Sequence, residues 1–130
     1  MANPNIVSVT SIVGANAAWA LTNTITTTLL TVAADVIVKI NSLIVTNIHG
    51  TNAATVSIAV GGMGSGATGV TVASGLATCR LASTMNVPAD DSLVLIDKPI
   101  YLMEGDVLRG GASASSVLEL FASYEVINDA

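Results

Sequence analysis

The chain has 130 residues, of which 52% are hydrophobic, 3% are aromatic and 10% are charged, and its formal net charge is −5. A chain of this length forms one domain and buries enough surface to fold without a metal or a disulfide. Its four Lys and Arg residues are scattered, which excludes a basic stripe for nucleic acid. A charge content well below the roughly 25% of an ordinary soluble domain indicates either a membrane or a large protein interface.

The pattern of the apolar residues argues against a membrane-spanning helix. Such a helix needs about 20 consecutive, mostly apolar residues. The best candidate, VAADVIVKINSLIVTNI, is interrupted by Asp35, Lys39, Asn41 and Asn47. The N-terminal sequence also lacks the basic region and the small-residue cleavage site of a signal peptide. We therefore expect neighbouring protein, and not a membrane, to cover the uncharged surface.

Apolar and polar residues alternate along the chain, and no segment has the spacing of an amphipathic helix. In the first third of the chain, strands are predicted at NIVSVTSIV (5–13), AAWAL (17–21) and TITTTLLTV (24–32). DVIVKI (35–40) and SLIVTNI (42–48) follow, and we expect them to form one long strand that bends near Asn41 and Ser42.

The sequence HGTNA (49–53) predicts a turn, with Gly50 free to take a positive φ and Asn52 able to bond its own backbone. The return strand TVSIAV (55–60) is expected to direct Val56, Ile58 and Val60 inward. A Gly-rich loop at 61–69 follows, and the segment 70–87 alternates again.

The C-terminal part of the chain predicts four more strands, at LVLI (93–96), IYLM (100–103), VLRGGAS (107–113) and VLELFASYEVI (117–127). The last strand has one face of Leu118, Leu120, Ala122, Tyr124 and Val126, and another of Glu119, Phe121, Ser123 and Glu125. Short strands without helical crossovers predict an all-β fold. We expect an antiparallel, jelly-roll-like β-sandwich, with one domain over residues 1–130. Residues 1–14 are expected to form an extended N-terminal arm or an edge strand.

One motif resembles a dinucleotide site, because GSGATG (64–69) follows a strand and Asp90 lies about 20 residues later. That chemistry needs a helix directly after the glycines, since the N-terminus of the helix holds the pyrophosphate. The following sequence, VTVASGLA, alternates like a strand and includes Gly75. We interpret the motif as a hairpin loop and expect no cofactor.

Two adjacent acidic residues, Asp90 and Asp91, follow Pro88 and predict a surface turn. A calcium site would use them together with Asp97, but their spacing matches no loop with ligands at alternate positions. We expect no metal, and a metal near Asp90 and Asp91 is the alternative to the turn.

The residues that nucleophilic catalysis requires are scarce. The one histidine, His49, lies on a predicted turn, with Asp35 as the nearest acid in the sequence. The one cysteine, Cys79, cannot form an intrachain disulfide and is interpreted as a small buried residue. We expect no catalytic residue and a protein that is not an enzyme.

A further polar turn is predicted at EGD (104–106), where Glu104 and Asp106 flank Gly105. We expect this turn to direct both carboxylates into solvent or toward a neighbour. Arg109 is their candidate partner for an ion pair.

Four blocks of the sequence resemble small bacteriophage virion structural proteins, especially those of cyanophage-like viruses. The blocks are MANPNIVSVTSI (1–12), KINSLIVTNIHGTNAATVSIAV (39–60), MNVPADDSLVLIDKPIYLMEGDVLR (85–109) and FASYEVI (121–127). They contain the group's G-T-N-A-A and V-P-A turns, its L-x-x-G-D-x-L segment and its S-Y-E strand. The middle segment, 61–85, is richer in Gly and Ala than that group leads us to expect.

The resemblance implies a β-sandwich subunit that coats or extends a virion as a homo-oligomer, often a trimer. We expect a capsid decoration or cement protein on the virion surface, assembled in the host cytoplasm and bound to itself and to the major capsid protein or other virion proteins. The alternative is a receptor- or glycan-binding module associated with a tail or head fibre. The expected interface residues are Asn5, Ile6, Val7, Val9, Trp19 and Phe121.

Overall fold

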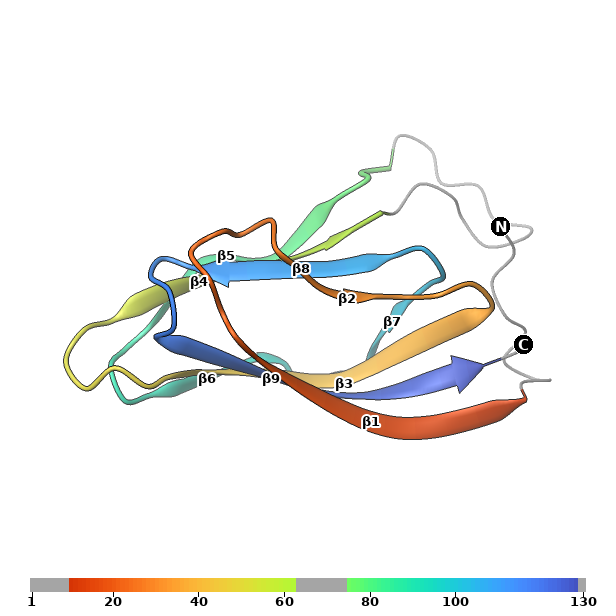
Figure 1. Ribbon diagram of the computed structural model, residues 1–130, viewed down its shortest axis with the longest axis horizontal. Coiled ribbons are helices and arrows are strands. Elements are labelled where there is room, and N and C mark those ends of the chain that lie inside the picture. Colours follow the sequence, from red (N-terminus) through yellow and green to blue (C-terminus); the bar gives the residue numbers. More distant parts are fainter. Residues whose placement is uncertain (1–9, 63–74, 129–130) are drawn as a thin grey trace.

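The computed structural model describes residues 10–62 and 75–128. In these residues it contains nine β-strands and no helix, and the strands form two antiparallel sheets that pack face to face (Figure 1). This arrangement confirms the predicted all-β sandwich. No helix of the described ranges is long and apolar enough to cross a membrane. Parts of three predicted features lie outside the described residues. These are residues 1–9 of the N-terminal arm or strand, residues 63–69 of the Gly-rich loop and residues 70–74 of the alternating segment.

The strands are divided between two sheets. In each sheet, a strand from the start of the chain pairs with a strand from its end. Sheet A has the order β1-β9-β3-β6, with β7 also paired to β3, and sheet B has the order β2-β8-β4-β5. Thus β1 lies beside β9, β2 beside β8 and β4 beside β5 (Figure 1). The strands of sheet A are β1 (Ser11–Ala20), β3 (Val36–Asn47), β6 (Ser92–Ile96), β7 (Ile100–Leu102) and β9 (Leu118–Asn128). Those of sheet B are β2 (Thr28–Thr31), β4 (Ala54–Gly61), β5 (Cys79–Val87) and β8 (Val107–Ala112).

The predicted bend of the long third strand is confirmed. Strand β3 runs without interruption from Val36 to Asn47, and its register against β9 shifts between Ile40 and Ser42. The extra residue at the shift, Asn41, is the mark of a β-bulge, which bends a strand while leaving its pairing intact on both sides.

The predicted boundaries near the N-terminus differ from the observed ones. The separate strands at 5–13 and 17–21 are one strand where the structure describes them, because β1 pairs with β9 over ten consecutive residues, including Gly14. The predicted strand at 24–32 shortens to β2, Thr28–Thr31. Residues before it follow β8 irregularly: Ala112 N–H donates to Thr22 O at 2.8 Å and Gly110 N–H to Thr27 O at 3.0 Å.

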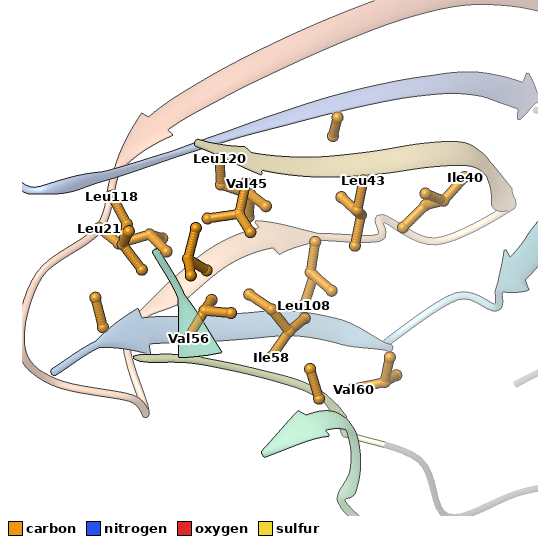
Figure 2. Packing of buried hydrophobic residues seen from close by; sticks show 14 of the residues in the cluster. Leu21, Ile40, Leu43, Val45, Val56, Ile58, Val60, Leu108, Leu118 and Leu120 are labelled. Carbon is orange, nitrogen blue, oxygen red and sulfur yellow. The ribbon is translucent and has the colours of Figure 1, made fainter. Parts of the chain in front are cut away.

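Side chains from the facing sides of both sheets form the hydrophobic core (Figure 2). The inward residues of β4 are those the alternation predicted, with Val56, Ile58 and Val60 at 0%, 1% and 5% exposure. The facing side of sheet A contributes fully buried side chains that include Leu43, Val45, Leu118 and Leu120. Burial of aliphatic side chains between two sheets is therefore the main stabilising term of the fold.

The turn after β3 forms where it was expected, but different groups hold it. Gly50 has no positive φ. Instead, the Nδ1 atom of His49 accepts hydrogen bonds from the backbone N–H groups of Thr51 at 3.2 Å and Asn52 at 3.0 Å. The side chain of Asn47 completes the turn, since its Oδ1 accepts from His49 N–H at 2.9 Å.

Candidate functional site

The outer face of sheet A carries an exposed line of apolar residues. Strand register places Ala18 opposite Phe121, Phe121 opposite Ile44, and Ile44 opposite Val94. Directly opposed residues of antiparallel strands point to the same face of the sheet. These four residues, which we call the apolar row, therefore cross β1, β9, β3 and β6 on the side away from the core.

The apolar row is accessible in the isolated chain. Phe121 is 42% exposed and Val94 is 55% exposed, whereas Ile44 between them is half-buried. A shallow hollow of about 410 Å³ lies beside the row, and its lining includes Trp19 and the charged Glu119 besides Ala18, Ile44 and Phe121. The row is thus an exposed apolar surface at the edge of a shallow hollow.

Charged groups on this face lie to either side of the apolar row. Glu119 is opposite Thr46 on one side, and on the other side Lys39 is opposite Glu125. Between that charged pair and the row lies a polar line that joins Asn16, Ser123 and Ser42. An uncharged centre with charges at its margins is the arrangement found in protein–protein interfaces.

A second apolar line crosses the same face near the end of the sheet, where Ile12 is opposite Ile127 and Ile127 is opposite Ile37. Ile37 and Ile127 are only 4% and 6% exposed, although both point away from the core by register. Ile12 is 59% exposed. Besides the apolar row, the outer face of sheet A therefore exposes Ile12 and, on β7 opposite Lys39, Tyr101 at 47% exposure.

The two predicted aromatic interface residues lie on neighbouring strands but point to opposite faces. Trp19 is opposite Leu120, and its half-buried side chain packs against the hydrophobic core. Phe121 is opposite Ala18 and points outward. Of the pair, Phe121 belongs to the apolar row and Trp19 supports the core. The other predicted interface residues, Asn5, Ile6, Val7 and Val9, lie outside the described residues.

The remaining members of the apolar row were not singled out by sequence reasoning. Ile44 occupies an outward position between the inward residues Leu43 and Val45, where alternation favours a polar side chain. Val94 takes the corresponding outward position on β6, whose sequence SLVLI has one polar residue, Ser92. The outward Ile44 is therefore the signal in the sequence, and its alignment with Phe121 and Val94 depends on the strand register.

Asp90 and Asp91 form the predicted surface turn. Asp91 N–H donates to Pro88 O at 3.2 Å, and Asp90 has a φ of 55° at the third position of this turn. That backbone conformation is the one a type II turn requires. In the described part of the chain, no group of three His, Cys, Asp or Glu side chains is placed to hold a metal ion.

The expectation for Glu104 and Asp106 is wrong. Both residues are buried, at 8% exposure each, and their carboxylates accept backbone hydrogen bonds. Glu104 Oε2 accepts from Asp35 N–H at 2.7 Å, and Asp106 Oδ2 accepts from Met103 N–H at 2.9 Å. Neither carboxylate has Arg109 as a hydrogen-bond partner among the described residues. Both acids stabilise the β7–β8 turn, where Gly105 has a φ of 85°.

The structure also locates the cysteine and the histidine of the chain. Cys79 begins β5 and is exposed, which corrects its assignment as a buried residue. His49 uses Nδ1 to hold the turn after β3. Together with the bond from its backbone N–H to Asn47 Oδ1, these contacts give His49 a structural role in the turn.

Comparisons of the chain with protein families, with curated proteins and with solved structures gave no match.

Proposed function

We propose that this protein is a non-enzymatic virion structural protein, a capsid decoration or cement subunit that binds the particle through the outer face of sheet A. The observation that carries this proposal is the apolar row, which crosses four of the five strands of sheet A and exposes Phe121 and Val94. In this proposal its partner is another protein, because the face combines an apolar centre with a few charges at its margins.

Burial of the apolar row supplies the driving force. Apolar surface removed from water contributes about 25 cal/mol per Å², and the association has to overcome the loss of rotational and translational freedom. Phe121 is the natural anchor, because aromatic side chains near the centre of an interface carry a large share of its binding energy. A subunit bound in this way across a seam between capsid subunits slows their separation.

The nested strand order supports the jelly-roll interpretation of this sandwich. The first strand pairs with the last, and the second strand pairs with the next to last. The two facing sheets that result each contain a run of four hydrogen-bonded strands. Jelly rolls occur in viral capsid proteins, and also in lectins and cupins. Because one fold hosts many functions, the apolar row and not the strand order carries the proposed function.

The proposal places the protein on the capsid surface as a homo-oligomer, with a trimer as the expected form. The major capsid protein, or another virion protein, is the partner for the outer face of sheet A. The resemblance of blocks 39–60 and 85–109 to virion proteins is the sequence-level support for this location.

The test is to reconstitute particles with the unmodified protein and with Phe121→Lys. A lysine in the centre of the apolar row has to be desolvated on binding, so we expect particle affinity to fall at least about tenfold, which corresponds to about 1.4 kcal/mol. Thr31→Lys is the matched control, because Thr31 is exposed on the opposite sheet. Co-sedimentation measures the bound fraction.

Three results would contradict the proposal. The first is that purified particles contain the protein at no fixed ratio to the capsid protein. The second is that Phe121→Lys and Thr31→Lys bind particles equally well. Specific binding to a glycan array with no binding to particles would favour the fibre-associated alternative.

A further inference from the structure

A second hollow, of about 90 Å³, lies on the outer face of sheet B, on the opposite side of the molecule from the apolar row. Its lining includes Ile25, Thr26, Ser57, Thr78, Arg80 and Arg109. The volume suits a group of a few heavy atoms, since a cavity of about 150 Å³ holds a benzene molecule. Among the residues that the structure describes, no carboxylate belongs to the lining.

Strand register brings two of the four basic residues of the chain to this hollow. Ala59 of β4 is opposite Arg80 of β5 on one side and opposite Arg109 of β8 on the other. Both arginines therefore point to the same face and flank Ala59. The two arginines are 29 positions apart in the sequence, so only the sheet brings them together.

The guanidinium group of Arg109 lies over the end of β4. A Cβ atom built on Gly61 would be 2.5 Å from Nη1 of Arg109 and 3.3 Å from Oγ1 of Thr78. The absence of a side chain at Gly61 leaves the space that the guanidinium occupies. The same geometry places the hydroxyl of Thr78 beside this cation.

Neither arginine is neutralised by the described residues around it. Arg80 Nη1 donates to Ser83 Oγ at 3.2 Å, and no acceptor for the half-buried Arg109 guanidinium is found among those residues. None of the acidic residues in the described ranges 10–62 and 75–128 lines this hollow. A guanidinium carries five N–H donors arranged to bind planar or tetrahedral oxygen groups.

A buried hydroxyl adds a fixed donor to the two cations. Ser57 is 7% exposed and lines the hollow, and its Oγ accepts from Thr84 N–H at 3.0 Å. The oxygen is therefore held in place while its hydrogen has no acceptor among the described residues. Thr84, with a φ of 48°, lies where the register of β5 against β4 shifts, and this irregularity brings its N–H to Ser57.

We propose that this hollow binds one oxyanion, a phosphate-like or carboxylate group, held by Arg80 and Arg109 with Ser57 as a neutral donor. The set of groups supplies positive charge and hydrogen-bond donors in a space that fits a single such group. Charge-assisted hydrogen bonds of this kind are about twice as strong as neutral ones. The inference is independent of the proposed function, because it concerns the opposite sheet.

The experiment titrates the full chain with inorganic phosphate and, separately, with acetate at constant ionic strength, using two-dimensional NMR. We expect saturable shifts of the Ser57, Arg80 and Arg109 signals. Arg109→Gln should weaken phosphate binding at least about tenfold. Lys39→Gln, which removes a cation from the other sheet, is the matched control and should bind like the unmodified protein.

Two further variants separate a binding role from a structural one. Arg109→Lys keeps the charge but loses the forked geometry, so its affinity should fall between those of the unmodified protein and Arg109→Gln. Ser57→Ala should weaken binding by a smaller factor. Circular dichroism verifies that each variant is folded before it is titrated.

The source of the oxyanion is tested by light scattering with and without phosphate. If phosphate dissociates oligomers, the natural occupant of the hollow is a carboxylate of a second copy of the chain. If the measured mass does not change, the occupant is a free ion. The proposal is overturned if neither anion gives saturable shifts, or if Arg109→Gln and Lys39→Gln bind phosphate with equal affinity.

Discussion

Asn47 is 1% exposed at the end of β3, and all of its side-chain hydrogen-bonding atoms are used. Its Nδ2 donates to Asn52 O and to Val87 O, both at 3.0 Å, while its Oδ1 accepts from His49 N–H at 2.9 Å. One amide therefore joins the turn after β3 to the end of β5. A buried polar group that is fully paired in this way stabilises a unique arrangement of the chain around it.

Replacing Asn47 with leucine tests this role. The change removes three hydrogen bonds, of which the one to Val87 O is buried and those to Asn52 O and from His49 N–H are partly buried. We expect the free energy of unfolding to fall by about 2–4 kcal/mol, measured by urea denaturation. Asn86→Leu is the control, because Asn86 is exposed on β5 and a surface change costs within about 0.5 kcal/mol. Equal losses in both variants would refute the role of Asn47.

At the scale of secondary structure elements, the segment 22–27 is held against β8 by backbone contacts. The close approach depends on Gly111, since a Cβ atom there would lie 2.6 Å from Thr24 O and 2.9 Å from Ile25 Cα. Backbone atoms cannot rotate away as a flexible side chain can. This glycine therefore determines how closely the segment before β2 follows the sheet.

Gly111→Ala should consequently displace the segment 22–27. We expect a loss of about 1–3 kcal/mol in the free energy of unfolding and faster amide exchange at Gly110 and Ala112. Gly14→Ala is the matched control, because it also lies in a strand and has no atom within 4 Å of the added Cβ. That control should be neutral or stabilising by about 0.4–1 kcal/mol. A Gly111 variant as stable as the Gly14 variant would show that the segment adjusts freely.

At the scale of the whole molecule, sheet A has two apolar sides with different roles. Its inner side belongs to the core, where Leu43 is fully buried, and its outer side carries the apolar row, where Ile44 is half-buried. In the proposed function, adjacent residues of this one strand therefore have different roles, Leu43 in stability and Ile44 in binding. The outer side of sheet B is different again, since it carries the paired cations Arg80 and Arg109.

Alanine substitutions at these adjacent positions distinguish the two sides. Leu43→Ala leaves a cavity in the core and should lower the free energy of unfolding by about 2–5 kcal/mol. Ile44→Ala removes an outward side chain, so we expect a loss of less than about 1.5 kcal/mol together with weaker binding to particles. Denaturant unfolding and co-sedimentation measure the two effects. A larger loss of stability at Ile44 than at Leu43 would contradict the assignment of faces.

Much of the fold was predictable because alternation in a strand is a local property. The inward positions of β4, the bend in β3 and the two faces of β9 could all be predicted from neighbouring residues. The acids of the β7–β8 turn were predicted wrongly, because Glu104 and Asp106 bond to backbone groups that only the folded turn and the distant Asp35 supply.

The sequence by itself determined that the chain forms strands, which side of most strands is apolar, and that few charges cover the surface. Only the tertiary structure decided which outward residues meet. It aligned Ala18, Phe121, Ile44 and Val94 in one row and placed Arg80 and Arg109 on either side of Ala59. The physical reason is that alternation specifies a face, whereas the neighbours on that face depend on the pairing and register of strands far apart in the chain.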